Sequence, residues 1–264
     1  MRIAPLALLL ALVMAAPAAA SFPDNSAVML SSVGEWVTGG VPRAYDDRNA
    51  TLTLTGTSGD VTLQIAGGDG SKFSMEFAAK PGTSLQPGVY KNVERAAFRS
   101  ANRAGMDISG NGHGCNTITG WFEVKDFAVD STGQVQRLQI LYEQHCDGLP
   151  PAIFGEVRYG EPAGVTPSEL RWPDSDFGSP AAPGAVLLLS PAPVTVADAS
   201  ITGSGADAFA IHYPTCIVGS PCPPPTGAGV VFEPSSPGTR SATLHITDSD
   251  GTAYTVPLRA SASR

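Results

Sequence analysis

The chain has 264 residues, of which 24 are acidic and 16 basic, so its formal net charge is −8. A surface that binds nucleic acid needs clustered lysine and arginine to neutralise phosphates. The sequence has no such cluster, so we exclude nucleic acid as a partner. Charged residues make up only 15% of the chain, whereas it has 29 glycines and 23 prolines. This composition favours short strands joined by tight turns.

The first 20 residues have the parts of a secretory signal peptide. Arg2 carries the positive charge, an apolar run extends from Leu6 to Met14, and Ala18 and Ala20 form an A-x-A type cleavage site. The apolar run is shorter than the roughly 20 residues of a membrane span. We therefore expect cleavage after residues 1–20 and a mature chain with no membrane span. That chain is expected to be secreted or to lie on the exterior of the cell envelope, without a C-terminal anchor.

Residues 21–160 are predicted to form an N-terminal β-sandwich domain. The runs "TLTLTG", "DVTLQIAG" and "KFSMEFA" alternate apolar and polar residues, which is typical of strands with one buried face. The segments "GTSGD" and "GGDGS" between them have the composition of turns. We expect the three strands to form an antiparallel meander.

A longer pair of strands follows, with the sequences "ITGWFEVKDFAVD" and "RLQILYEQHC". The apolar positions of the first change phase, which predicts a β-bulge near Lys125 and Asp126. In the second, alternation places Glu143 and His145 on the outer face. The opposite face is expected to be buried and carries Leu138, Ile140, Tyr142, Gln144 and Cys146.

Residues 161–173 are predicted to be a proline-rich linker, and residues 174–264 a second β-sandwich of immunoglobulin type. No segment of helical length shows apolar residues at i, i+3, i+4 and i+7. The predicted fold class is therefore all-β, with two β-sandwich domains.

The four cysteines are interpreted as two disulfides, because the compartments that exported proteins enter are oxidising and thiols form disulfides there. Local pairing joins Cys115 to Cys146 in the first domain and Cys216 to Cys222 in the second. In the chain-entropy model the first bond contributes about 3 kcal/mol to stability.

A zinc site made from these cysteines with His113 and His145 is the alternative. Because His145 and Cys146 are adjacent on a strand, their side chains leave opposite faces of the sheet and cannot converge on one ion. A catalytic Cys–His pair requires a free thiolate, which an oxidising compartment disfavours. We expect no cofactor and no catalytic residue.

The glycine-rich segment "SGNGHGCN" has two interpretations. Asp107, Asn111 and nearby carbonyl groups can supply oxygens to calcium, which takes six to eight of them. The spacing lacks the D-x-D-x-D pattern, so a glycine-permitted turn that brings Cys115 to its partner is favoured. The calcium alternative stays open at this stage.

Two functional alternatives rest on the strand "ITGWFEVKDF". If Phe122 and Val124 point inward, Trp121 points outward and offers a platform for stacking a sugar ring. A covering loop or domain is the competing expectation, because large aromatic side chains are mostly buried. Glu123 and Asp126 are the candidate carboxyl pair of a polysaccharide-active enzyme.

The segments "DFGSPAAPG", "ITGSGADAFAIHYPTC" and "VVFEPSSPGTRSATLHITDSDGTAYTVPLRA" resemble the choice-of-anchor D domain over residues 174–260. This resemblance implies an immunoglobulin-like β-sandwich in an exported bacterial protein. The family usually has its second cysteine six positions before the Phe of F-x-P, where this chain has Thr226, so Cys222 implies a shifted disulfide.

The first half, through "GNGHGCNTITGWFEV" and "EQHCDGLPPAIFGEVRY", resembles a domain of exported bacterial proteins with no established activity. That resemblance implies the pair Cys115–Cys146. The sequence as a whole predicts an exported, non-catalytic module for binding, adhesion or structure, with an extracellular protein or glycan as its unknown partner. Sugar binding through Trp121 and polysaccharide cleavage through Glu123 are the alternatives.

Overall fold

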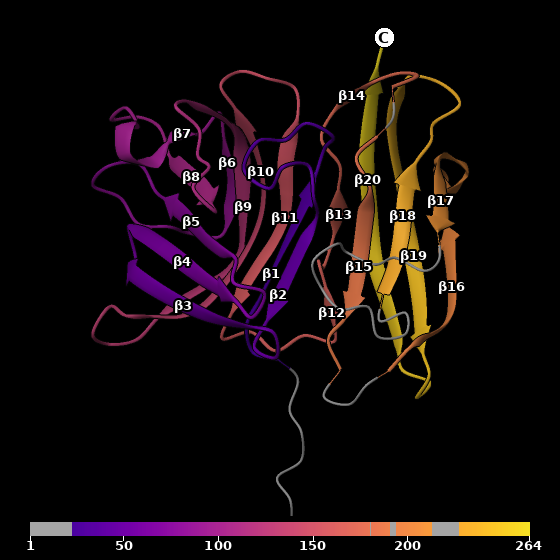
Figure 1. Ribbon diagram of the computed structural model, residues 1–264, viewed down its shortest axis with the longest axis horizontal. Coiled ribbons are helices and arrows are strands. Elements are labelled where there is room, and N and C mark those ends of the chain that lie inside the picture. The colour runs from indigo at the N-terminus through magenta and orange to yellow at the C-terminus, as the bar shows by residue number, and fades with distance from the viewer. Residues whose placement is uncertain (1–22, 180, 191–193, 213–226) are drawn as a thin grey trace, which may run out of the picture.

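The computed structural model describes residues 23–179, 181–190, 194–212 and 227–264. These residues form an all-β protein with two β-sandwiches that lie side by side (Figure 1). The predicted signal peptide, residues 1–20, lies outside the described residues, as do Cys216 and Cys222.

The first sandwich consists of sheets 1 and 2. Sheet 1 has six strands in the order β2-β1-β11-β10-β9-β6, and sheet 2 has five in the order β3-β4-β5-β8-β7. Sheet 1 contains β1 (Ser26–Ser31), β2 (Arg43–Asp46), β6 (Gly88–Lys91), β9 (Ile118–Val129), β10 (Val135–Cys146) and β11 (Ala152–Tyr159). Sheet 2 contains β3 (Ala50–Thr57), β4 (Asp60–Gly67), β5 (Lys72–Ala78), β7 (Glu94–Arg95) and β8 (Gly105–Gly110), and the short 3₁₀ helix η1 (Ala96–Phe98) follows β7.

The second sandwich consists of sheets 3 and 4. Sheet 3 has the order β12-β15-β18-β17, and sheet 4 has the order β13-β20-β19-β16, with β14 also paired to β20. Sheet 3 contains β12 (Val165–Thr166), β15 (Gly184–Leu188), β17 (Phe209–His212) and β18 (Gly227–Phe232). Sheet 4 contains β13 (Leu170–Arg171), β14 (Ser175–Asp176), β16 (Val196–Thr202), β19 (Gly238–Asp248) and β20 (Ala253–Ser263), and the 3₁₀ helix η2 (Ala206–Ala208) precedes β17. The immunoglobulin type of this sandwich stays a prediction.

The local patterns of the first half are confirmed. Strands β3, β4 and β5 form the expected antiparallel meander. Gln139 pairs with Asp126 and Ile140 with Val124, which leaves Lys125 as the extra residue of a β-bulge. This bulge explains the change of phase in the apolar pattern of β9.

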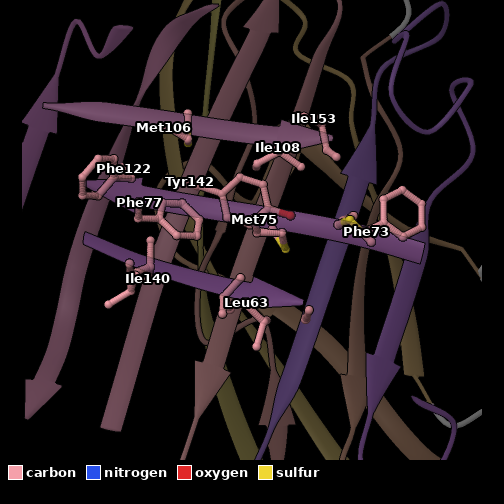
Figure 2. Packing of buried hydrophobic residues seen from close by; sticks show 14 of the residues in the cluster. Leu63, Phe73, Met75, Phe77, Met106, Ile108, Phe122, Ile140, Tyr142 and Ile153 are labelled. Atoms are coloured by element: carbon pink, nitrogen blue, oxygen red, sulfur yellow. The ribbon is translucent and has the colours of Figure 1, made fainter. Parts of the chain in front are cut away.

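The core of the first sandwich lies between sheets 1 and 2 (Figure 2). Phe77 from β5 meets two rings of the opposite sheet, with centroid distances of 5.5 Å to Phe122 and 5.9 Å to Tyr142. The Tyr142 hydroxyl donates to the Val28 carbonyl oxygen at 2.8 Å. The buried face of β10 is therefore the one that alternation predicts, and its polar atoms have partners.

Strands β1 and β11 of sheet 1 are buried on both faces, because the second sandwich packs against their outer side. In β1, Ala27 and Met29 belong to the first core, whereas Val28 and Leu30 pack with the second core. Phe154 in β11 also joins the second core. β1 thus reads as a continuous apolar run from Ala27 to Leu30, whereas β11 places the buried pair Glu156 and Arg158 on its outer face.

The predicted linker belongs to the second sandwich. Within residues 161–173, β12 pairs with β15 and β13 pairs in parallel with β20. The second sandwich therefore begins at Val165 rather than at residue 174. A proline-rich composition indicates turns. It does not show that the two-residue segments Val165–Thr166 and Leu170–Arg171 pair with strands far along the chain.

Glu156 lies at the junction of the two sandwiches and is fully buried. One carboxylate oxygen accepts from Gln139 Nε2 at 2.8 Å and from the Ser168 hydroxyl. The other accepts from Arg158 Nε at 2.8 Å, Thr166 Oγ1 at 3.2 Å and Ser168 N at 3.0 Å. A carboxylate of β11 thus fixes the segment that leads into the second sandwich.

Within the described part of the chain, no helix is long and apolar enough to cross a membrane.

Candidate functional site

Three loops at one end of the first sandwich carry exposed side chains, three of which are large and apolar. We call Val33, Trp36, His113 and Leu149 the loop-end surface. Val33 is 85% exposed, Trp36 56% and Leu149 59%. Apolar side chains exposed to this extent on neighbouring loops indicate an interaction site rather than the ordinary scatter of surface hydrophobics.

Direct contacts bring the three loops together. The rings of Trp36, in the loop after β1, and His113, in the loop after β8, have centroids 4.7 Å apart. Ser32 N, directly after β1, donates to the Ala152 carbonyl at 2.9 Å, so the loop after β1 begins beside the end of the loop after β10. The surface is therefore assembled from distant segments: Trp36 precedes His113 by 77 residues, and His113 precedes Leu149 by 36.

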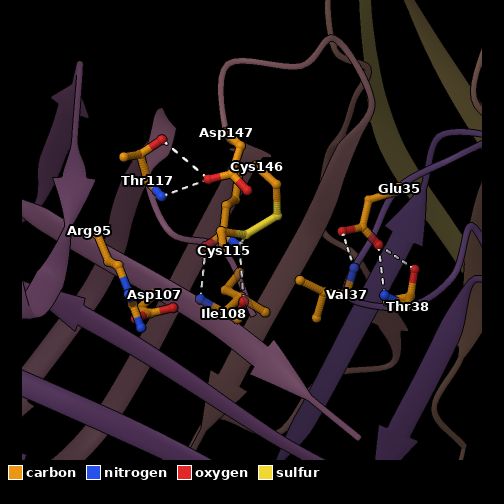
Figure 3. The surroundings of a disulfide bond; sticks show 11 residues. Glu35, Val37, Thr38, Arg95, Asp107, Ile108, Cys115, Thr117, Cys146 and Asp147 are labelled. Atoms are coloured by element: carbon orange, nitrogen blue, oxygen red, sulfur yellow. Dashed lines mark hydrogen bonds and ion pairs between the residues drawn. A yellow bond between two sulfur atoms is a disulfide. The ribbon is translucent and has the colours of Figure 1, made fainter. Parts of the chain in front are cut away.

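A disulfide joins the loop after β8 to the last residue of β10, where the next loop begins (Figure 3). Cys115 bonds to Cys146, as the sequence predicts, and the described residues contain no free cysteine. Beside it, Asp147 Oδ1 accepts from Thr117 N at 2.8 Å, while Asp147 N donates to the Thr117 carbonyl at 3.0 Å. The loop after β10 is thus fixed to the loop after β8 by covalent and hydrogen bonds.

Gln144 connects the two sheets beneath the disulfide. Its side-chain oxygen accepts from Ile108 N at 2.8 Å, and its Nε2 donates to the Ile108 carbonyl at 2.9 Å. Because Ile108 lies in β8 and Gln144 in β10, this amide pair fixes the ends of both sheets under the loops. Buried polar pairs of this kind stabilise a single arrangement of the strands when all their atoms are satisfied.

A buried carboxylate shapes the loop that carries Trp36. Glu35 is 3% exposed, and its oxygens accept from Val37 N at 2.7 Å, Thr38 N at 2.8 Å and Thr38 Oγ1 at 2.6 Å. Since Glu35 and Val37 both point inward, the residue between them points outward. The exposure of Trp36 is therefore a property of a tightly bonded turn.

The segment "SGNGHGCN" forms the predicted turn. Gly110 N donates to the His113 carbonyl at 2.9 Å, and His113 N donates to the Gly110 carbonyl at 2.8 Å. Asn111 and Gly112 both have positive φ, 52° and 84°, which is the geometry of a type I′ hairpin turn. Asn111 Oδ1 accepts from Lys72 N at 2.9 Å, so this oxygen already serves the turn.

The two histidines of the zinc alternative have separate surroundings. His113 packs against Trp36, whereas the ring of His145 contacts Glu143 and Pro150. The described residues contain no group of three or more His, Cys, Asp or Glu side chains arranged to hold a metal ion. Because the sulfur atoms of Cys115 and Cys146 bond to each other, neither is a thiolate ligand.

Asp107, the other calcium candidate, belongs to an acidic cluster on the outer face of sheet 2. Its carboxylate pairs with Arg95 Nε at 2.8 Å, and it lies directly across the ladder from Glu76. The pKa of Glu76 is raised to about 7. The largest cause is partial burial, and Asp60 adds charge repulsion and a hydrogen bond. Asp107 adds further charge repulsion. Arg99 opposes this shift only in part.

We predict that Glu76→Gln removes part of the pH dependence of stability. A carboxyl group with a raised pKa in the folded state stabilises the fold below its unfolded pKa, 4.5, and loses that contribution as pH rises through about 7. The variant should therefore lose less stability than the natural chain between pH 4.5 and pH 8, measured by urea unfolding at each pH. Glu161→Gln is the control, and equal pH profiles for all three proteins would contradict the prediction.

Trp121 does not form an open platform. Its side chain points out of the first core as expected, but Arg171 of β13 covers it, with the guanidinium carbon 4.7 Å from the ring centroid. Leu30, Leu141, Phe154 and Pro167 line the same small recess. The second sandwich thus occupies the face on which a sugar ring was expected to stack.

Glu123 and Asp126 are both engaged by basic side chains. Glu123 contacts Lys125 Nζ at 3.1 Å and Arg171 at 3.1 Å, and Asp126 contacts Arg137 Nε at 2.8 Å. Burial raises the pKa of Glu123, but bonds and attraction from Lys125 and Arg171 outweigh it and hold that pKa below its ordinary value. The hydrogen bond from Arg137 likewise lowers the pKa of Asp126.

Sequence reasoning missed Val33, Trp36 and Leu149 as a group. A signal was present, because "SSVGEWVTGG" and "CDGLPP" combine turn-forming residues with apolar residues that no strand pattern accounts for. Only the folded chain brings these segments together.

A comparison with protein-family models gives no match to this chain, and a comparison with curated proteins gives no similar sequence.

Proposed function

We propose that this chain is a non-catalytic extracellular binding module that recognises a protein partner through the loop-end surface. The observation that carries the proposal is the exposure of Val33, Trp36 and Leu149 on loops that a disulfide and buried hydrogen bonds hold in place. Preorganised loops bind well because little conformational freedom is lost on association.

The chemistry of the surface favours a protein over a sugar. A sugar ring gains from stacking on Trp36, but it gains little from the aliphatic side chains of Val33 and Leu149. These aliphatic groups are stabilised by burial against apolar side chains of another protein. The surrounding glycines, asparagines and serines resemble the loops of protein-binding paratopes, where a rigid aromatic residue anchors the contact.

The alternatives receive less support from the same side chains. A glycosidase needs a carboxylic acid with a raised pKa beside a second carboxylate, whereas Glu123 and Asp126 both have lowered values. Sugar stacking on Trp121 requires Arg171 to leave the ring that it covers. The export signal and the resemblance of residues 174–260 to the choice-of-anchor D domain are consistent with a role outside the cell.

Binding is tested by immobilising the mature chain, presenting it with the extracellular protein fraction of the producing cells, and titrating each purified partner against it. Trp36→Ala is expected to weaken the interaction about thirtyfold, because a central aromatic anchor typically contributes 2 kcal/mol or more. Affinity is measured by calorimetry, with a glycan array tested in parallel.

Phe98→Ala is the matched control, because Phe98 is also exposed, at 74%, but lies in η1, where Arg95 rather than a loop-end residue contacts its ring. It should leave the affinity unchanged. The proposal fails if Trp36→Ala and Phe98→Ala have equal effects, or if the array finds a glycan that binds through Trp36 while no protein does.

A further inference from the structure

The ring of His145 holds the loop after β10, which carries Leu149, at two points. Nδ1 lies 2.9 Å from the Pro150 carbonyl oxygen, and Nε2 lies 3.0 Å from Glu143 Oε1. The side chain of His145 is 20% exposed and that of Glu143 13%, so both lie partly out of water. The imidazole thus connects the rigid strand β10 to the end of the loop at residues 147–151.

Both partners of this ring are acceptors. A backbone carbonyl has no proton to donate, and a carboxylate accepts through both oxygens. A neutral imidazole has one N–H and therefore satisfies only one of them, whereas the imidazolium donates to both. The observed contacts are complete only when His145 carries its second proton.

Among the described residues around His145, Glu143 is the charged group in contact with its ring. Its neighbours across the sheet are Thr119 on β9 and Ala152 on β11, both uncharged. The Asp147 carboxylate faces Thr117 on the far side of the loop. The more distant ionised side chains of this face pair among themselves, with Arg171 joining Glu123 to Glu169 and Lys125 bridging the same two carboxylates.

We propose that His145 is a proton-controlled clamp, closed at acidic pH and released at alkaline pH, that sets the order of residues 147–151. This inference rests on the proposed function, because Leu149 is part of the loop-end surface. When the clamp is closed, the partner meets an ordered loop and association loses less conformational entropy. Affinity for the partner therefore falls as pH rises.

The direction of titration agrees with the geometry. The pKa of His145 is raised above 6.5, chiefly by its hydrogen bond to Glu143. The negative charge of Glu143 and the carbonyl groups of the loop act in the same direction, whereas burial opposes them. A histidine with a raised pKa stabilises the folded state fully below its unfolded pKa, and this contribution is lost as pH rises through the folded pKa. The clamp therefore opens at a higher pH than the one at which an ordinary histidine loses its proton.

The test uses the mature full-length chain without any partner. NMR follows the His145 ring between pH 5 and pH 9, and native-state hydrogen exchange follows the Leu149 amide, which donates to the Cys146 carbonyl at 2.9 Å. After correction for intrinsic exchange rates, protection of Leu149 is expected to fall about tenfold over this range, the effect of one charge-assisted hydrogen bond. In His145→Gln the protection should be independent of pH.

His245→Gln is the control, since His245 lies in β19 of the second sandwich, where it contacts Thr202, and it should leave the pH-dependent protection of Leu149 unchanged. Glu143→Gln should lower the pKa of His145. A His145 pKa at or below 6.5, or equal protection of Leu149 at both ends of the range, overturns the proposal. If Leu149 protection does not change with pH but a protein still binds through Trp36, this inference fails and the proposed function stands. If protection changes with pH but no protein binds, the proposed function fails and the clamp stands.

Discussion

Glu156→Ala is expected to lower the free energy of unfolding by about 3–5 kcal/mol, the usual cost of removing one partner from a buried ion pair. The substitution leaves the Arg158 guanidinium, which is 9% exposed, without its carboxylate. It also removes the acceptor of Thr166 and Ser168 and one of the two acceptors of Gln139. Urea unfolding followed by far-UV circular dichroism measures this loss.

The same variant reports on the coupling of the two sandwiches. Thr166 and Ser168 precede β13, so their release loosens the attachment of the second sandwich to sheet 1. We expect a single calorimetric transition in the natural chain to separate into two in Glu156→Ala. Glu161→Ala, which removes a partly exposed carboxylate beside Arg137, is the control and should cost less than about 1 kcal/mol. A similar small loss in Glu156→Ala would show that the buried carboxylate does not join the sandwiches.

Replacing both Cys115 and Cys146 by serine is expected to lower the free energy of unfolding by about 3–4 kcal/mol. The bond closes a loop with a sequence separation of 31 residues, and the chain-entropy model gives a cost of this size for losing it. The loss should appear in urea unfolding as a lower midpoint. It should also weaken binding through Trp36, because the disulfide lies under the loops that carry the loop-end surface.

Thr117→Val is the matched control for the disulfide. It removes a hydroxyl that donates weakly to Asp147 at 3.3 Å and leaves the backbone bond and the disulfide in place. Its expected cost is below about 1 kcal/mol. If the double serine variant were as stable as Thr117→Val, the loops would depend on Gln144 and Glu35 rather than on the covalent bond.

Features that depend on neighbouring residues could be predicted from the sequence. Alternation predicted the meander of β3, β4 and β5 and the inward face of β10, from Leu138 to Cys146. The change of phase at Lys125 predicted a bulge, and the glycines of "SGNGHGCN" predicted the turn before Cys115. Side chains two apart on a strand share a face whatever the rest of the chain does, so such patterns can be read locally.

The candidate site was only partly predictable. The Cys115–Cys146 bond was expected, but the importance of Trp36 was not, because nothing in residues 32–40 tells that His113 and Pro151 lie beside them. Trp121 was the more attractive aromatic residue, since it lies on a regular strand with a known outward face. Its covering by Arg171 depends on a sandwich whose position no local pattern specifies.

By itself, the sequence determined the all-β class, the faces of the main strands and the pairing of the first two cysteines, since each follows from periodicity or from the pairing of nearby cysteines. The tertiary structure alone decided that β1 and β11 are buried on both faces, that residues 165–171 join the second sandwich, and that three distant loops form one surface. The physical reason is that these features depend on which apolar faces meet across long stretches of chain, and many pairings of similar faces satisfy the same local pattern.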